Sequence, residues 1–322
     1  MIKIIYITES GKKLAEKIKC ILDHYKYNSK IFHIKNFSID EGDEGYIFIS
    51  AIGIVLRKYI DKIKNDKFTD SFVIVCNEKK EFIPILSNHL GRGNYFSKLI
   101  ANNINGKTIF TTATDVHGKV GLDELSNILF LEKPNRKDIL EINKRLLEEN
   151  IDLKLPYGWK IKLNGYDVEY HDKDLVIIDN RIKLRPLKIV VGIGARRGVK
   201  RYKVYWAIKK ALYLRSLYPW RISAFSTIEN KRDEIGILEV VNKFKKPFLI
   251  FDKDEINKLY NIYDLEKSDF IFKNINVYGV AEPCSILGVK KLTNVDYNKI
   301  YLMLKKIKYD GVTIAISTHK EF

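Results

Sequence analysis

Short apolar runs alternate with amphipathic segments along much of this chain, and this order limits most strongly what it can fold into. Residues 2–7 form a largely β-branched run, typical of a strand buried in a parallel sheet. Thr8 then opens a segment with leucine, alanine and isoleucine at helical spacing, which predicts a capped helix. The same order recurs as far as residue 125. Further strands are expected at 31–34, 46–50, 71–76, 81–86 and 107–112.

The pattern changes twice further along and divides the chain into three parts. A charged amphipathic helix at 135–149 is followed by three short strands with no helices between them, at 160–163, 167–171 and 175–178. Strands and helices then alternate again. The strands expected there are 188–193, 222–227, 248–251 and 311–317, and the helices are 202–217, 234–244 and 254–260. We therefore predict two three-layer α/β domains with mainly parallel sheets, 1–125 and 187–322, joined by a smaller mixed middle segment, 126–186.

The turn at residues 87–94 joins a predicted strand to a predicted helix and is the first candidate site. Gly91 and Gly93 let the backbone come close to a ligand, and free amides at a helix start favour an anion. His89 lies within this turn, and an unperturbed imidazole pKa of about 6.5 suits proton transfer near neutrality. Alternatively, the turn needs glycine only for its own tight geometry.

A second candidate site, residues 111–118, follows another predicted strand. Asp115 and His117 lie at its carboxyl end, where ligands bind in open α/β sheets. An imidazole and a carboxylate that share a cleft can activate water. Taken alone, Asp115 is equally a turn or cap residue, because aspartate often bonds nearby backbone in turns.

A third candidate site is the glycine-rich segment Gly192–Gly198, which contains Arg196 and Arg197. It lacks the third glycine of the dinucleotide-binding pattern and the Gly-Lys-Ser/Thr of a phosphate-binding loop. Two guanidinium groups at a helix start suit carboxylate or phosphate. Ten basic and no acidic residues occur between Lys188 and Ile228, which indicates an anionic partner. The aromatic residues interleaved with these bases either stack on a flat ring or belong to the core.

The overall composition narrows the class of protein. A net charge of +17 indicates a nucleic acid, a membrane surface or a polyanionic small molecule as the partner. Cys20, Cys76 and Cys284 lie far apart, so neither a zinc motif nor a disulfide framework is expected. The first residues are too short and strand-like for a signal peptide, and the longest apolar stretch, 46–56, is too short for a membrane span. We expect a cytoplasmic protein without its own metal site.

Several motifs, in the right order, resemble the cobalt-precorrin-5A hydrolase family of anaerobic cobalamin synthesis. In the N-terminal half they are Ala51-Ile52-Gly53 with Arg57, Pro84–Gly91 with Asn94, and Thr111–Asp115. In the C-terminal half they are Gly192–Gly198, Ser226-Thr227-Ile228 with Lys231, Val280-Ala281-Glu282 and Gly311–Ala315. The chain departs from the family where Arg92 replaces a usual glycine and Ala195 a frequent cysteine.

The resemblance implies a hydrolase that opens the ring-A acetate δ-lactone of cobalt-precorrin-5A, releases acetaldehyde and gives cobalt-precorrin-5B. The partner would be an anionic cobalt-containing tetrapyrrole, with no cofactor besides the cobalt it carries. The implied catalytic residues are His89, Asp115 and Glu282. The implied substrate-binding residues are Arg57, Ser87, Gly91, Gly93, Asn94, Thr114, Gly192, Gly194, Arg196, Arg197, Gly198 and Lys231.

Two other classes of function remain open at this point. Charge and interleaved aromatic residues also suit a nucleic-acid-binding protein, although no helix-turn-helix, finger or RNA-binding signature occurs. A non-catalytic corrinoid-binding protein would use the same basic groups without turnover. For the hydrolase we expect one cleft between residues 1–125 and 187–322, lined by the loops at 51–57, 87–94, 111–118 and 192–198. The sequence predicts neither the oligomeric state nor contacts with other pathway enzymes.

Overall fold

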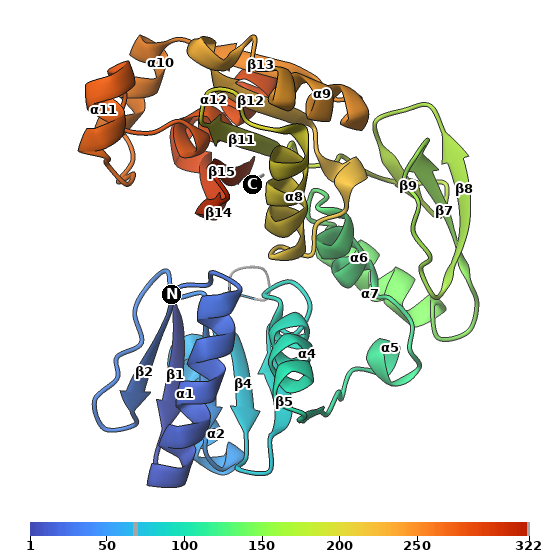
Figure 1. Ribbon diagram of the computed structural model, residues 1–322. Coiled ribbons are helices and arrows are strands. Elements are labelled where there is room, and N and C mark those ends of the chain that lie inside the picture. Colours follow the sequence, from blue (N-terminus) through green and yellow to red (C-terminus); the bar gives the residue numbers. More distant parts are fainter. Residues whose placement is uncertain (67–69, 321–322) are drawn as a thin grey trace.

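The computed structural model describes residues 1–66 and 70–320 of the chain. Three units are built around separate sheets, with the N-terminal unit at the bottom of Figure 1, the C-terminal unit at the top and the middle unit beside them. Parallel pairs outnumber antiparallel ones, and the predicted α/β class is confirmed. Within the described ranges, no helix combines the length and the apolar character needed to cross a bilayer.

The N-terminal sheet has the order β2-β1-β3-β4-β5-β6. Strands β1 to β4 are parallel, whereas β5 is antiparallel to β4, and β6 follows the direction of β5. The carboxyl ends of β5 and β6 therefore lie at the sheet edge opposite to those of β1, β3 and β4. The strands are β1 Ile2–Tyr6, β2 Ser29–His33, β3 Gly45–Ile49, β4 Phe72–Cys76, β5 Glu81–Leu86 and β6 Lys107–Thr108. The last of these is much shorter than predicted.

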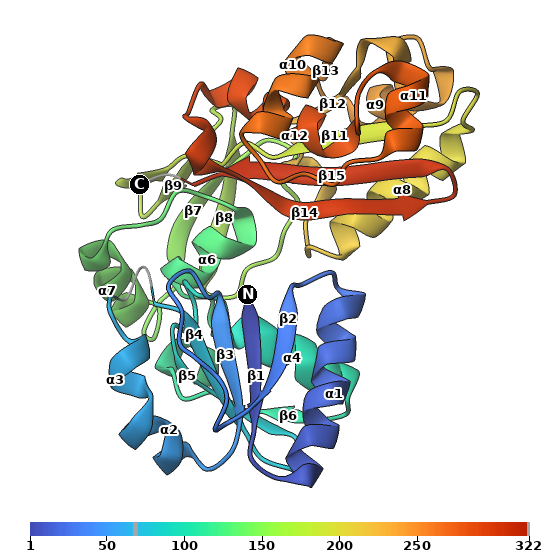
Figure 2. The same cartoon turned by 90° about the vertical axis from the view of Figure 1, so that its left-hand side faces the viewer.

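Helices cover both faces of this sheet (Figure 2). On one face α1 (Glu9–His24) and α4 (Gly93–Asn103) pack against Ile4 and Ile47, and on the other α2 (Ile52–Lys58) and α3 (Ile60–Ile63) lie against Phe48. The Thr8 hydroxyl accepts a hydrogen bond from the Gly11 amide at 3.0 Å, as expected for the cap of α1. A short helix, α5 (Ala113–Val116), occupies part of the stretch predicted as a loop.

The middle unit packs helices α6 (Leu122–Leu129) and α7 (Arg136–Arg145) on a four-stranded sheet of order β10-β9-β7-β8. The sheet contains β7 Ile151–Pro156, β8 Tyr166–His171, β9 Val176–Ile178 and β10 Ile182–Leu184. The strand predicted at 160–163 is wrong, because these residues supply Ile161 and Leu163 to the core without a strand neighbour, and β7 and β10 were not predicted. Helix α6 packs in the core of this unit and runs across residue 125, where a domain boundary was predicted.

The C-terminal sheet has the order β13-β12-β11-β15-β14, and β11, β12 and β13 are parallel. Helices α8 (Arg201–Tyr213) and α9 (Ile235–Phe244) cover one face, and α12 (Ala281–Thr293) covers the other beside α10 (Lys253–Lys258). Helix α11 (Asp269–Ile275) lies at the periphery (Figure 1). The strands are β11 Val190–Ala195, β12 Ala224–Ile228, β13 Phe248–Phe251, β14 Ile300–Tyr309 and β15 Val312–His319.

Two features of the C-terminal unit differ from the prediction. Strand β14 was missed because register shifts at Leu302/Leu304 and Leu304/Ile307 break the two-residue alternation of its buried side chains. Strand β11 extends to Ala195, so Gly192 lies in a strand and not in a glycine-rich turn. A Cβ atom at Gly192 would collide with the carbonyl oxygen of Ala281 in α12. The close packing of β11 against α12 therefore requires glycine at this position.

Candidate functional site

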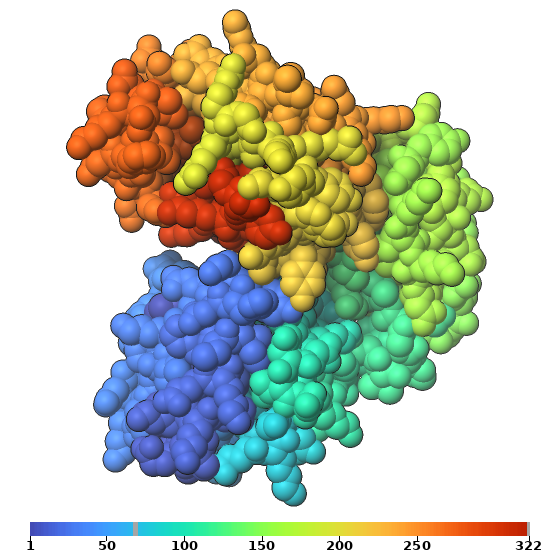
Figure 3. All heavy atoms as spheres, in the orientation of Figure 1, coloured from blue at the N-terminus to red at the C-terminus, as the bar shows by residue number. Residues whose placement is uncertain are grey.

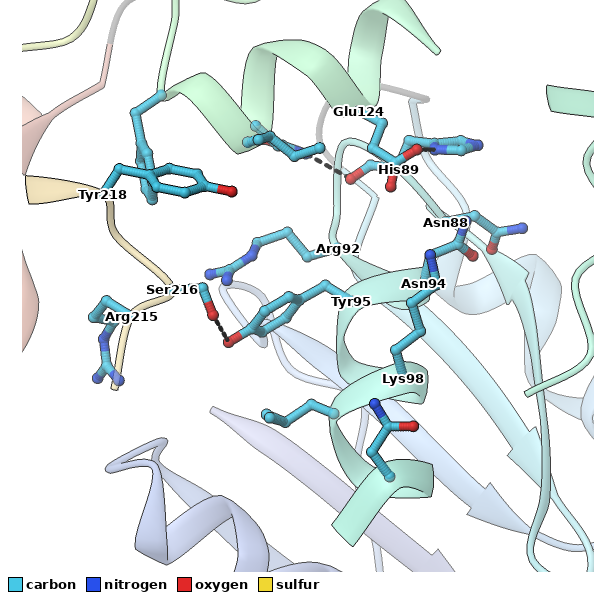
Figure 4. A pocket seen from close by; sticks show the side chains of 15 residues that line it. Asn88, His89, Arg92, Asn94, Tyr95, Lys98, Glu124, Arg215, Ser216 and Tyr218 are labelled. Carbon is cyan, nitrogen blue, oxygen red and sulfur yellow. Dashed lines mark hydrogen bonds and ion pairs between the residues drawn. The ribbon is translucent and has the colours of Figure 1, made fainter. Parts of the chain in front are cut away.

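Two adjoining cavities lie between the three units. One, of 390 Å³, is lined by the turn before α4, by α6 and by the segment after α8 (Figure 4). The other, of 660 Å³, continues from it between Lys26 and Glu44 of the N-terminal unit and Tyr301 of β14. Figure 3 shows the hollow between the N-terminal unit and the β14–β15 hairpin. Arg92 and Arg215 line both cavities, which therefore meet at these two guanidinium groups.

The turn at 87–92 presents His89 to the smaller cavity. The amides of Arg92, Gly93 and Asn94 donate to the carbonyls of His89, Ser87 and Asn88 respectively. These amides are thus used inside the turn and are not free to hold an anion. The prediction that free amides at the start of this helix bind an anion is therefore wrong for these three. A Cβ atom at Gly91 would collide with the Ser87 side chain, so glycine is needed for this compact turn. Asn127 of α6 anchors the turn by donating to the His89 carbonyl at 2.6 Å.

His89 and Asp115 come together from the two predicted loops. The His89 Nε2 atom lies 3.4 Å from Asp115 Oδ2, and their side chains are only 8% and 4% exposed. The same carboxylate oxygen accepts a hydrogen bond from Asn94 Nδ2 at 2.8 Å, which fixes its orientation. The neighbouring Thr114 is buried in the same place. His117, by contrast, ends α5 and is exposed.

Glu124 of α6 is a third member of this group that sequence reasoning missed. Its Oε2 atom lies 4.0 Å from His89 Nδ1, whereas Asp115 lies nearest to Nε2. Burial raises the pKa of the Glu124 carboxyl above its ordinary value, against the opposing effects of His89 and Lys98. In the sequence, Leu122–Leu129 shows only an amphipathic helix with acids in its first turn, which gives no sign of a site.

Unpartnered polar atoms are concentrated around this group. Both ring nitrogens of His89 are buried and make no hydrogen bond to any described residue. The same holds for side-chain oxygen atoms of Ser87, Asn88, Asn94 and Thr114. Buried polar groups without partners are costly, so such a concentration indicates a place that a polar ligand or water occupies.

His89, Asp115 and Glu124 are also the described residues that could hold a metal ion, since their donor atoms lie within 4.8 Å of one another. Two carboxylates and one imidazole suit a divalent transition metal. The nearest contacts join Asp115 to Nε2 at 3.4 Å and Glu124 to Nδ1 at 4.0 Å. The same arrangement also suits an imidazole that exchanges protons with its two neighbours.

The remaining predicted binding residues lie elsewhere, and the expected cleft of four loops is wrong. Arg57 is exposed on α2, at the sheet edge where β3 ends, whereas the reversed strand β5 brings 87–94 to the opposite edge. The segment 196–200 precedes α8, and the cavity lies beyond the other end of this helix, roughly 20 Å away at 1.5 Å per residue. Gly194 is buried in β11 beside Thr313.

A second group of predicted residues gathers around Glu234 at the carboxyl edge of β11 and β12. Arg197 forms two bonds of 2.7 Å to the exposed Asp233 carboxylate, and the Gly198 amide donates to Glu234 at 2.9 Å. Lys231 approaches the buried Glu234 at 3.5 Å. Arg196 is exposed next to the β14–β15 turn, where its amide donates to the Gly311 carbonyl. Binding roles for these residues stay predictions.

Glu282 lies in neither group. It is buried in the first turn of α12, and its Oε1 atom accepts a hydrogen bond from the Lys306 amide of β14 at 2.9 Å. This contact ties α12 to the edge strand of the sheet. The structure therefore gives Glu282 a packing contact within the C-terminal unit and separates it from His89 and Asp115.

Acids from other segments neutralise part of the basic segment 188–228. The ion pairs are Lys188 with Asp174, Arg197 with Asp233 and Lys203 with Asp310, at N–O distances of 2.6, 2.7 and 2.8 Å. Arg215 and Arg221 are buried and donate to backbone carbonyls. Of the aromatic residues, Trp206 is 54% exposed, and Trp220 stacks on Trp159 in the protein. The run of bases is thus partly structural, which weakens the case for nucleic acid.

Comparisons with known proteins bear on both larger units. Residues 39–115 match the family model described as Cobalamin synthesis G N-terminal, and residues 189–317 match Cobalamin synthesis G C-terminus. A Methanocaldococcus jannaschii protein named "Probable cobalt-precorrin-5A hydrolase" is 64% identical over 319 residues, 99% of each chain. The cobalt-precorrin-5A hydrolase of Priestia megaterium is 27% identical over 310 residues, 87% of this chain and 80% of that protein.

A solved structure resembles the whole chain. The crystal structure of a cobalamin biosynthesis protein G homologue from Sulfolobus solfataricus covers 99% of this chain and 97% of its own, with a TM-score of 0.59. Sequence identity over this match is 23%, so the likeness concerns the fold.

Proposed function

The chain belongs to the cobalt-precorrin-5A hydrolase family of cobalamin synthesis, and we propose that it opens the ring-A acetate δ-lactone of cobalt-precorrin-5A and releases acetaldehyde, giving cobalt-precorrin-5B. The observation that supports this reaction best is the buried His89–Asp115 pair beside a cavity between the units. A cavity at the junction of three units, lined by aromatic and basic side chains, suits a broad anionic ring.

The proposed reaction has two steps that both need a proton carrier. In the first, His89 takes a proton from water as the water oxygen adds to the lactone carbonyl, and it returns this proton to the ring oxygen of the lactone, which leaves as a hydroxyl. In the second, this hydroxyl loses its proton and becomes the aldehyde carbonyl as the carbon–carbon bond to the macrocycle breaks. The bonding electron pair returns to the macrocycle, which takes up a proton. Asp115, held by Asn94, orients the imidazole and stabilises its protonated form.

The direct test is anaerobic incubation of the purified protein with cobalt-precorrin-5A. We expect one acetaldehyde per substrate, measured by a coupled dehydrogenase assay. The corrinoid product should differ in mass from the substrate by the gain of one water and the loss of one acetaldehyde. Substrate that stays bound without release of acetaldehyde would support the non-catalytic corrinoid-binding alternative. Opening of the lactone without loss of the two-carbon unit would limit the proposal to its first step.

Chelator treatment is expected to leave the rate of acetaldehyde release unchanged. The reason is that the proposed reaction uses His89 as a proton carrier beside Asp115 and Glu124, and none of its steps needs an ion bound to these side chains. The enzyme would be incubated with EDTA, desalted and assayed, with its metal content measured before and after. Loss of activity that a single divalent metal restores would instead identify the three side chains as a metal site.

A further inference from the structure

Arg92 has an unusual backbone conformation for its residue type. It precedes α4 with a φ of 69°, in the left-handed region that favours glycine. Its side chain offers no cap to the helix. An arginine in this conformation stores strain that glycine at the same position would not.

The guanidinium group of Arg92 lies where the two cavities meet. It stacks over the Tyr95 ring at 4.2 Å and extends across the smaller cavity toward the segment after α8 (Figure 4). Within the described part of the chain, no carboxylate lies within ion-pairing distance of this group. Its polar neighbours are Tyr27, with which it makes a side-chain hydrogen bond, and Tyr95, while Glu44 attracts it from a longer distance.

Arg215, the second guanidinium at this junction, cannot take the same role. It donates to the carbonyls of Tyr25, Lys26, Leu214 and Met303 at 2.5 to 3.0 Å, and these bonds engage all three of its nitrogens. Arg215 therefore fixes the junction of the units through backbone carbonyls. Arg92, which forms no ion pair with a described acid, remains available to bind an anion.

We propose that Arg92 binds a carboxylate arm of the substrate across the junction of the two cavities. This inference rests on the proposed function for the identity of the ligand, an anionic macrocycle with carboxylate side chains. A planar guanidinium backed by an aromatic ring offers two parallel donors to one carboxylate. The bond would hold the ring at the mouth of the smaller cavity, beside His89 and Asp115.

Arg92→Gly separates binding from folding. Because glycine relieves the backbone strain, this variant is expected to be at least as stable toward urea as the parent, while KM for cobalt-precorrin-5A rises by about tenfold or more. The value of kcat should change by less than about threefold. Arg92→Lys keeps the charge but loses the paired donors, so its KM should also rise. Lys245→Gly, which removes another left-handed residue at the end of α9, is the matched control with parental KM.

Equilibrium binding of cobalt-precorrin-5A, followed anaerobically by its absorbance, tests this inference apart from turnover. A parental dissociation constant for Arg92→Gly would overturn the inference even if the protein is active. Weaker binding by this variant, together with no acetaldehyde from the parent, would sustain the inference and refute the proposed reaction. Weaker binding by Lys245→Gly as well would show that the loss comes from the backbone change and would overturn the role of Arg92.

Discussion

His89→Ala is expected to lower the rate of acetaldehyde release by roughly 100-fold or more, the usual size of a lost acid–base group. In the proposed reaction the buried imidazole carries the proton, with Asp115 and Glu124 as the neighbours of its two nitrogens. Substrate binding should remain, because the backbone of this turn is held by its own amides and by Asn127. Single-turnover release and equilibrium binding measured on the same preparation would show this separation.

His117→Ala is the matched control, since it removes an imidazole from the same region that is exposed and ends α5. Its rate should equal that of the parent. Acetaldehyde release by His89→Ala at the parental rate would remove His89 from the mechanism and leave Asp115 as the first candidate for the base. A rate loss shared equally by both histidine variants would indicate a change in the fold of the region.

The class of fold follows from the sequence because it depends on local patterns. Buried runs such as Ile2–Tyr6 and capped helices such as Glu9–His24 identify themselves over a few residues. In strand β14, by contrast, two register shifts interrupt the alternation of buried and exposed side chains. The buried face is formed by Ile300, Leu304 and Ile307, and the lysines between them obscure this pattern in the sequence. The local pattern failed where the backbone departed from regular pairing.

The candidate site could be predicted only in part, for a geometric reason. His89 and Asp115 were found because each follows a strand, and β5 and β6 are parallel neighbours with a common carboxyl edge. The antiparallel turn between β4 and β5 reverses the chain and places 87–94 at the edge opposite to Arg57. Glu124 comes from the middle unit, and its approach to His89 depends on how the units pack, which no local pattern contains.

The basic residues between Lys188 and Ile228 have different roles in the structure. Between Lys188 and Ile228 all charges are positive, but Arg197 meets Asp233 from a later segment. Arg221 is buried, pairs with none of the acids that the structure describes, and donates to backbone carbonyls of Leu129, Phe130 and Leu187. The basic character of this segment therefore combines ligand-binding candidates with residues that hold the units together.

Arg221 joins the C-terminal unit to the middle unit at α6. Its guanidinium is 3% exposed and lies 4.7 Å above the Trp159 ring of the middle unit. Burial lowers the pKa of Arg221 to about 10, so the group stays charged at neutral pH. The Phe130 carbonyl has a second donor in the Leu187 amide, whereas the Leu129 and Leu187 carbonyls depend on the arginine.

Arg221→Met is therefore expected to lower the free energy of unfolding by about 3 kcal/mol, because it leaves the buried Leu129 carbonyl and the part-buried Leu187 carbonyl without a donor. Urea denaturation followed by circular dichroism would measure the change. Arg197→Met is the control: this arginine has an ideal carboxylate partner but is 64% exposed, so its loss should cost less than about 1 kcal/mol. A larger loss of unfolding free energy in Arg197→Met than in Arg221→Met would contradict this account of the junction. In that case the attachment of α6, and with it the position of Glu124 beside His89, would depend on the apolar contacts around Trp159 and Trp220.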